Sequence, residues 1–480
     1  MKPSGRGPRK SDDFGKWFDY VLSEAELLDV RYGVKGFVVY RPNAMKIVAR
    51  IYRMLEGELE RAGHRQVLFP VVIPLSNMKK ETEHVKGFED QVFMIERAGG
   101  EELQEKLVLR PTSETAVYPM VALWVRSYGH LPLKMYQSVA VYRHETKATR
   151  PLLRGREFLW IETHDVFPTE KEAEEQVLQD LDVEKRVCQE LGLAFMVADR
   201  EPWDKFPGAE YSYAYDVPLP DGHVIQIGTT HYLKDKFTKA FDVSFLGRDG
   251  KWETPVSTCF GPGVGRMLAA VIATHGDDGG LVLPFGMAEH DVVIVPIQQK
   301  GQEESVKSKC AELLDKIGGA GYDCALDDSD RSPGSKFFAW EVKGVPLRVE
   351  VGPKEVAERK VTVFRRDTRT RETMGEEDLL ARMGELKGDM LKTLARRSQD
   401  LLREKQKRAT TRAEVTDLAA GRYIIKMGFC GERGCADEIR KATDGYEVRG
   451  RALDESAKPS GNCAWCGRPA LRTVYVADAY

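Results

Sequence analysis

The segment Tyr142–His164 carries aromatic, acidic and basic side chains at a spacing that could build a ligand site. Four of these side chains alternate with apolar ones, namely Phe158, Trp160, Glu162 and His164. Because successive side chains of a strand point to opposite faces, these four would line one surface while Leu159 and Ile161 pack behind it. Beside Arg143 and Arg154, such a surface suits a ligand with a flat base, phosphates and an ammonium group. The alternative is a half-exposed antiparallel sheet whose ion pairs bind no ligand.

A second candidate is FGPGVGR at residues 260–266, a glycine-rich turn that leads into an apolar helix. Its backbone N–H groups and Arg266 could contact a phosphate. The strands before it are predicted to be antiparallel and no βαβ unit surrounds the glycines, which argues against a dinucleotide site. We therefore expect Arg266 to reach across a nucleotide from the side opposite Arg143.

The strand-like run VIQIGTTHYL at residues 224–233 contains three polar residues, Gln226, Thr229 and His231. Strict alternation would separate Gln226 from the other two, so a shared site needs a kink, which Gly228 permits. For His231 the alternative is a hydrogen-bonded residue of the core.

Four cysteines near the end of the chain occur as two pairs, Cys430 with Cys435 and Cys463 with Cys466. Two such pairs that meet tetrahedrally would bind zinc with no open coordination position, so the site would be structural. A redox pair or inert thiols are the alternatives.

The elements that position these residues can be predicted from hydrophobic periodicity. A long helix from Pro42 to Ala62 precedes a strand broken by Pro70, and the strand before Pro111 leads into a helix capped by Thr112 or Ser113. An acidic helix follows from Thr169 to Leu191, with strands near residues 213–217, 224–227 and 254–258. This order indicates an α+β domain built on a mostly antiparallel sheet.

The pattern changes after residue 288. From Val292, strands and helices alternate as in βαβ units, which predicts a compact α/β domain. A charged helix over about residues 375–408 then leads to a small domain that carries the four cysteines. We place the domains at residues 1–288, 289–398 and 399–480.

Composition is that of a soluble multidomain protein: 480 residues, 42% hydrophobic, with a net charge of −3. No apolar run approaches a membrane span and no signal segment opens the chain, so we expect a cytoplasmic protein with no membrane partner. A basic stretch could be a solvated face or a contact to a nucleic-acid backbone. Its residues are Arg359, Lys360, Arg365, Arg366, Arg369 and Arg371.

Three segments resemble the three motifs of class II aminoacyl-tRNA synthetases. They are the long helix with its Pro-containing strand, the strand–loop–strand that carries an arginine and FLW, and the glycine-rich segment that ends in an arginine. RPTSET, YRHE, REFLW, QIGTTH and HGDDGGLVLP are similar to the prolyl-tRNA synthetase family over nearly the whole chain. Only about 100 residues separate YRHE from FGPGVGR, too few for the bacterial editing domain. With the Cys-bearing end, this resembles the archaeal and eukaryotic type.

The resemblance implies activation of L-proline with ATP and transfer of prolyl to tRNA(Pro) by a homodimer, with Mg²⁺ on the phosphates and structural Zn²⁺. The α/β domain would bind the anticodon, and the helix from Pro42 with its strand would form the dimer interface. Arg143 would bind the α-phosphate and the proline carboxylate, and Arg266 would cover adenine and touch the leaving pyrophosphate. These two arginines would carry catalysis by electrostatics, because no nucleophilic side chain is needed.

The resemblance also assigns the other site residues. Those implied to bind ATP are Arg143, Glu145, Arg154, Gly155, Phe158, Gln226, Thr229 and Arg266. Those implied to bind proline are Thr112, Glu114, Arg143, Trp160, Glu162, His164, Phe206, His231 and Cys259. Glu114 would accept hydrogen bonds from the imino group. Archaeal-type members end in a tyrosine whose carboxylate folds toward the active site, which Tyr480 could do as well; a frayed terminus is the alternative.

One departure is CFGPGVGR, where eukaryotic members carry a Trp and threonines with one residue fewer, which concerns the local loop rather than Arg266. A synthetase for another small amino acid, such as threonine or glycine, is one alternative, although a pocket walled by an indole matches a hydroxyl side chain poorly. A regulatory protein that has lost aminoacylation is another. Such a protein should lack one of the arginines or the RPTSET loop, and this chain keeps them all.

Overall fold

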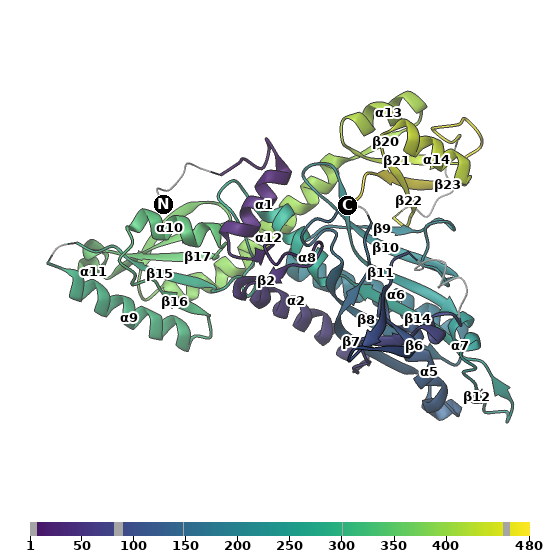
Figure 1. Cartoon of the computed structure of the whole chain (residues 1–480). Coiled ribbons are helices and arrows are strands. Elements are labelled where there is room, and N and C mark those ends of the chain that lie inside the picture. Colours follow the sequence, from purple (N-terminus) through teal and green to yellow (C-terminus); the bar gives the residue numbers. More distant parts are fainter. Residues whose placement is uncertain (1–6, 81–89, 147, 300, 455–460) are drawn as a thin grey trace.

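The computed structural model describes residues 7–80, 90–146, 148–299, 301–454 and 461–480 (Figure 1). Its centre is a sheet of eleven strands in the order β20-β21-β23-β22-β9-β10-β11-β14-β8-β7-β3. The strands of the first domain are β3 (Arg65–Gln66), β7 (Leu133–Tyr142), β8 (Glu157–Phe167), β9 (Met196–Asp199), β10 (Tyr211–Pro218), β11 (Val224–Lys234) and β14 (Val256–Pro262). All neighbours from β7 to β9 pair antiparallel, and the parallel pairs are at the two edges, β3 with β7 and β20 with β21. This confirms the predicted mostly antiparallel sheet.

Helices α2 (Pro42–Arg61), α6 (Glu170–Leu191) and α8 (Val264–His275) cover one face of this sheet. The apolar side of α2, including Ile47 and Leu55, packs into the same core as Ile161 of β8. Since Leu159 and Ile161 face this core, the alternate residues of β8 are left for the opposite face. The predicted division of β8 into a packed face and a ligand-facing surface is therefore present.

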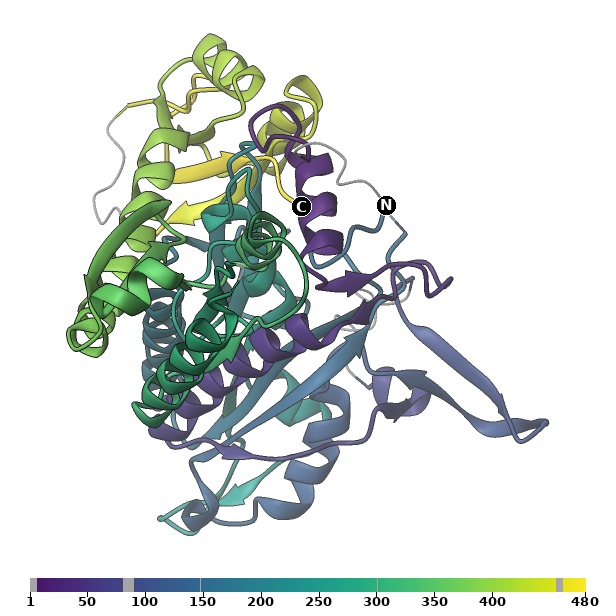
Figure 2. The same cartoon turned by 90° about the vertical axis from the view of Figure 1, so that its left-hand side faces the viewer.

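The predicted break at Pro70 separates two sheets: β3 joins the large sheet, while β4 (Val72–Pro74) joins a three-stranded sheet of order β4-β6-β5. Strands β5 (Phe93–Ala98) and β6 (Glu101–Leu109) form a hairpin that projects from the body of the molecule (Figure 2). Helix α5 (Glu114–Trp124) begins after Ser113, as the sequence predicts. The smaller elements are α1 (Phe14–Glu24), β1 (Leu28–Asp29), β2 (Val39–Tyr40), α3 (Leu75–Met78), η1 (Tyr128–His130), α7 (Lys236–Ala240), β12 (Phe245–Leu246) and β13 (Trp252–Glu253).

The second domain, at the left in Figure 1, is an α/β unit with a five-stranded sheet of order β16-β15-β17-β18-β19. Its strands are β15 (Val292–Pro296), β16 (Cys324–Leu326), β17 (Leu347–Val351), β18 (Lys360–Arg365) and β19 (Thr370–Gly375). Helices α9 (Glu303–Gly319), α10 (Pro333–Val342) and α11 (Pro353–Glu358) connect them. Strands β16, β15 and β17 pair in parallel, which agrees with the βαβ pattern of the sequence.

The basic stretch of this domain is mostly engaged in ion pairs within the chain. Arg366 is fully buried and donates to Asp277 at 2.8 Å, which links this domain to the catalytic domain. Arg365 pairs with Asp367 at 2.8 Å, and Arg369 with Glu341 at 3.0 Å. Much of the stretch therefore stabilises the fold, an outcome that neither sequence-based alternative included.

Helix α12 (Leu379–Lys405) crosses from the second domain to the C-terminal part without a break (Figure 1). The C-terminal elements are β20 (Gln406–Ala409), α13 (Arg412–Ala420), β21 (Ile424–Phe429), α14 (Arg433–Ala442), β22 (Glu447–Ala452) and β23 (Arg472–Ala477). Strand β22 pairs with β9, so the C-terminal strands extend the sheet of the first domain. No sequence pattern predicts this pairing, because partners about 250 residues apart leave no local pattern.

Within the described ranges, every helix is too short or too polar to pass through a lipid bilayer.

Candidate active site

A cavity of about 370 Å³ lies on the ligand-facing side of β8, β11 and β14. Most residues singled out in the sequence line it, although they come from five separate helices and strands and from the loops between such elements. They are Thr112, Glu114, Arg143, Glu145, Arg154, Gly155, Phe158, Trp160, Phe206, Gln226, Thr229, His231, Cys259 and Arg266. Glu162 and His164 are absent from the cavity wall and lie beneath it.

The two predicted catalytic arginines are held by backbone carbonyls. Nε of Arg143 donates to Pro111 O at 3.0 Å, and its guanidinium lies 5.2 Å from the ring centroid of Phe158 and 5.3 Å from that of Trp160. Arg266 donates to Leu153 O and Gln226 O, both at 3.2 Å. Both guanidiniums are thus oriented before any ligand arrives, which is the preorganisation that electrostatic catalysis requires.

The cavity has a surplus of positive charge. Its lining includes five arginines and Lys205 but three carboxylates, so it favours a ligand with several negative charges. Burial, together with repulsion from Arg143 and Arg154, lowers the pKa of Arg266 to about 10. Bound phosphates would relieve this repulsion, and a flat base could stack on the exposed face of Phe158.

The other end of the cavity is a small, uncharged pocket. The ring of His231 stacks on Phe206 at 4.6 Å, and its Nδ1 lies 2.8 Å from Ser212 Oγ. Burial, with repulsion from Arg143 and Arg200, lowers the pKa of His231 to about 3, so the imidazole is neutral at physiological pH. With Trp160 and Cys259 beside it, this pocket suits a compact apolar ring.

The carboxylate of Glu114 is buried at the edge of this pocket. Its Oε2 accepts a hydrogen bond from Thr112 Oγ1 at 2.6 Å. Beneath them, Glu162 accepts from Ser113 N at 3.1 Å and lies 3.4 Å from His164 Nε2. Glu162 therefore holds the 112–114 loop from below, with His164 beside it, and neither forms the pocket wall that the resemblance implied.

Strand β11 contains the kink that a shared site would need. The pairing of β10 with β11 shifts register between Tyr215 and Asp216, so Gly228 and Gln226 oppose consecutive residues and Ile227 is skipped. This shift brings Gln226 to the same side as Thr229 and His231, and all three line the cavity. His231 is thus both hydrogen-bonded and available to a ligand.

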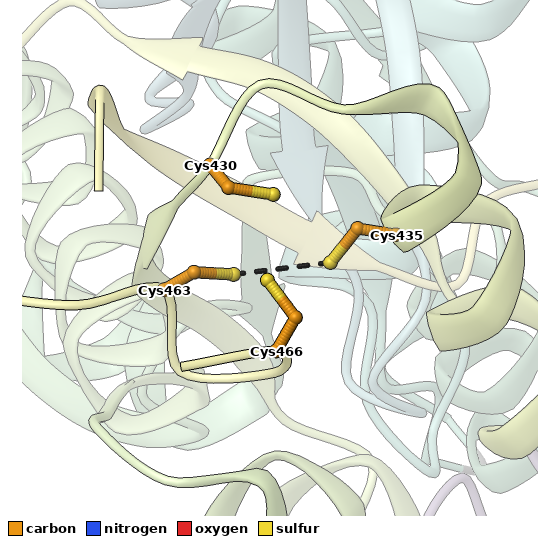
Figure 3. Close-up of side chains that lie close together, drawn as sticks. All are labelled: Cys430, Cys435, Cys463 and Cys466. Carbon is orange, nitrogen blue, oxygen red and sulfur yellow. Dashed lines mark hydrogen bonds between the residues drawn. The ribbon is translucent and has the colours of Figure 1, made fainter. Parts of the chain in front are cut away.

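The four C-terminal cysteines converge on one point (Figure 3). Their sulfur atoms all lie within 4.8 Å of one another, and Sγ of Cys435 lies 3.8 Å from Sγ of Cys463. Tetrahedral Zn–S bonds of about 2.3 Å place sulfur atoms about 3.8 Å apart, so the spacing fits zinc. Arg468 donates to Cys430 Sγ at 3.6 Å and to Cys466 Sγ at 3.4 Å, which suits thiolates.

Comparison with known proteins agrees with this geometry. Residues 93–275 match the class II core domain of the G, H, P, S and T tRNA synthetases, and residues 291–386 match an anticodon-binding domain. Residues 414–480 match the prolyl-tRNA synthetase C-terminal domain. The proline–tRNA ligase of Thermofilum pendens is 50% identical over 100% of both chains. The chain belongs to the prolyl-tRNA synthetase family. The archaeal/eukaryotic type expected from the sequence is confirmed.

Two further members place the chain within the family. The proline–tRNA ligase of Methanopyrus kandleri is 42% identical over 98% of this chain and 96% of its own. The prolyl-tRNA synthetase of Giardia lamblia, solved in complex with prolyl-adenylate, is 34% identical with a TM-score of 0.95, covering 99% of this chain and 100% of its own. The class II core, the anticodon-binding domain and the C-terminal domain are all present in this chain.

Two arginines that line the cavity were missed in the sequence. Arg449, from β22 of the C-terminal domain, donates to both oxygens of buried Asp216 at 3.0 and 3.1 Å. Arg200 donates to Arg449 O at 3.0 Å and also to Gln226 Oε1. In this member of the prolyl-tRNA synthetase family, the C-terminal domain therefore contributes directly to the active-site wall.

The terminal tyrosine of the chain lies against the loop between β7 and β8. Arg150 Nη1 donates to the Tyr480 hydroxyl at 3.2 Å, and that hydroxyl donates to Asp221 at 2.6 Å. His223 stacks on the Tyr480 ring with centroids 4.4 Å apart. The side chain of Tyr480 thus lies against the loop that carries Arg154, and the position of the terminal carboxylate stays a prediction.

Docking of this tail should weaken as the pH rises. His223 lies 3.0 Å from Asp221 and 3.1 Å from Asp478; burial alone would lower its pKa, but these carboxylates raise it to about 9. A raised pKa gives stability that is complete below the unfolded value of about 6.5 and is lost as the pH rises through about 9. Thermal unfolding of the native chain and of His223→Gln should differ most near pH 6 and least above pH 9. A difference that stayed constant with pH would contradict this linkage.

Proposed function

We propose that the chain is a proline–tRNA ligase that activates L-proline with ATP to prolyl-adenylate and transfers prolyl to the 3′ end of tRNA(Pro). One observation carries this proposal: a single cavity combines an arginine-rich end over Phe158 with a small neutral pocket beside Glu114. Arg143 contacts the rings of Phe158 and Trp160 between these two ends, where the α-phosphate and the proline carboxylate must meet. The relatives named above support the assignment.

The roles follow from position and charge. Arg143 neutralises charge as the proline carboxylate attacks the α-phosphorus, and Arg266 stabilises the leaving pyrophosphate. Arg154 and Glu145, 3.9 Å apart, bracket the distal phosphates and the adenine. Glu114 accepts hydrogen bonds from the imino group. Mg²⁺ accompanies the ATP, bound chiefly by phosphate oxygens and water.

Aminoacylation of a tRNA(Pro) transcript with radiolabelled proline tests this proposal. We propose that the α/β domain reads the anticodon and that the enzyme acts in the cytoplasm, where it must distinguish tRNA(Pro) from other tRNAs. We therefore expect charging of this transcript and none of a tRNA(Thr) transcript. Charging of tRNA(Thr), or no charging of tRNA(Pro) by a folded protein, would contradict it.

We propose that the four-cysteine site binds one structural zinc ion. Replacing Cys463 with serine should abolish zinc binding and lower the melting temperature, because the C-terminal core packs around these cysteines. Metal analysis and thermal unfolding check this, with Cys310→Ser in the second domain as the control, since that buried cysteine lies far from the cluster in sequence and fold. Purified native protein without zinc would refute the site.

We propose a homodimer that forms through an exposed apolar patch. The patch comprises Leu68, Leu123, Trp124, Leu246 and Trp252, between 40% and 80% exposed. Phe69 packs on Trp124 at 5.8 Å and Leu246 bridges to Ser127, so its three segments adjoin. Most apolar residues of α2 are buried in its own chain, with Met45 exposed, which leaves the strand region after it for a partner.

Replacing Leu68, the most exposed residue of the patch, with aspartate should therefore yield a monomer. Light scattering after gel filtration measures the mass. The matched control is Leu178→Asp, an exposed leucine on α6 outside the patch. A monomeric native chain, or a dimer that survives Leu68→Asp, would contradict this interface.

A further inference from the structure

A second cavity of about 400 Å³ lies beside the active site. One wall comes from residues 30–40, and the other from residues 149–158 of the loop into β8. It shares Leu152, Arg154, Gly155 and Phe158 with the active-site cavity, so the two are contiguous. None of the roles proposed above for ATP or proline uses the outer wall, residues 30–40.

The lining of this cavity joins apolar and cationic groups. Val30 and Val34, which are 60% and 50% exposed, keep apolar surface open to solvent. Lys35, Arg150 and Arg154 contribute positive charge, against the single carboxylate of Glu157. Apolar surface for a base and cations for a phosphate are the features that bind unpaired nucleotides.

The outer wall is fixed in place rather than collapsed onto the loop. Arg156 N donates to Gly36 O at 2.8 Å, and Phe37 contacts Phe93 with centroids 5.9 Å apart. Gly36 has φ +82°, and a Cβ there would lie 2.6 Å from Arg156 Cγ. These contacts hold residues 30–38 beside the start of β8 and keep the cavity open.

We propose that this cavity binds an unpaired nucleotide of the tRNA 3′ end and leads the terminal ribose to the adenylate. The inference rests on the proposed function, because only a chain that transfers prolyl to tRNA must admit a single strand at this point. Contiguity with the active-site cavity gives the direction of entry, and the charge of Lys35 and Arg150 matches a nucleic-acid backbone.

A two-step assay of the double variant Val34→Ser with Lys35→Ala tests this proposal. The prolyl-transfer rate from preformed adenylate to tRNA(Pro), divided by the tRNA concentration, should fall about tenfold. Proline-dependent ATP–pyrophosphate exchange should stay within about twofold, because that step involves no tRNA. Val39→Ser is the matched control, since Val39 is 44% exposed on the same stretch but does not line the cavity. An equal fall in exchange would assign the cavity to ATP, and unchanged transfer would remove its role, so either overturns the proposal.

Footprinting of the unchanged chain gives an independent test. Intact tRNA(Pro) should protect Lys35 from acetylation, and the same tRNA without its last three nucleotides should not. Equal protection by both RNAs, or by neither, would overturn the proposal. Failure of the native chain to exchange pyrophosphate would instead refute the proposed function itself.

Discussion

Replacing Arg143 with alanine is expected to lower proline-dependent ATP–pyrophosphate exchange by about a thousandfold or more. Arg143 donates to Pro111 O and lies against the rings of Phe158 and Trp160. This is where the proline carboxylate and the α-phosphate are proposed to meet. Removing Arg143 takes away the charge that offsets two anions brought together in the transition state. The exchange rate at saturating ATP and proline measures this loss.

The control is Arg143→Lys, which keeps the charge but loses the planar fork of the guanidinium. It should recover part of the rate, since a lysine ammonium cannot bind two oxygens in parallel. Thermal unfolding separates this effect from misfolding. An Arg143→Ala chain that is folded and exchanges at a tenth of the native rate or better would contradict the role assigned to this arginine.

Replacing Arg449 with alanine should have the second largest effect, although this residue lies in the C-terminal domain. It would leave the buried Asp216 carboxylate without its bidentate partner and with only Arg200, 3.6 Å away, as a counter-charge. Losing one partner of a buried pair costs about 3–5 kcal/mol when no other charge compensates, so this range is the upper bound here. Because Arg449 also lines the cavity and adds positive charge there, the KM for ATP should also rise. Denaturant unfolding and exchange kinetics measure the two effects.

The double variant Arg449→Met with Asp216→Leu separates loss of the pair from an unpaired charge. It should recover most of the stability, because apolar residues often replace a buried ion pair without loss. It should not restore the KM for ATP if the guanidinium itself shapes the active site. Full stability and native KM in Arg449→Ala would show that the pair contributes to neither.

Local patterns predicted much of the fold and the site. Alternation in β8 correctly placed Leu159 and Ile161 in the core and the aromatic pair on the cavity side. The kink that a shared site would need, and that Gly228 permits, is present and gathers Gln226 and His231. The cysteine spacing predicted the cluster of four sulfur atoms, since ligand pairs are encoded within a few residues of one another.

What the sequence could not show depends on contacts between distant segments. Arg449 reaches the active site only because β22 pairs with β9, and no residue pattern near either strand predicts this pairing. Arg366 resembles a nucleic-acid contact in the sequence, yet it is buried against Asp277. Glu162 and His164 lie on the predicted face of β8 but beneath the 112–114 loop, because the hydrogen bond from Ser113 draws that loop over them.

The most direct measurement is ATP–pyrophosphate exchange by the native chain with each of the twenty amino acids in turn. We expect strong exchange with proline and weak exchange with alanine or cysteine. Both are small enough to enter the pocket, and they bind less well only because they make fewer contacts with it than proline does. Proline-dependent exchange that fails in Arg143→Ala would establish both the activation step and its site. A folded chain that binds ATP but exchanges with no amino acid, or prefers another amino acid to proline, would contradict the proposed function.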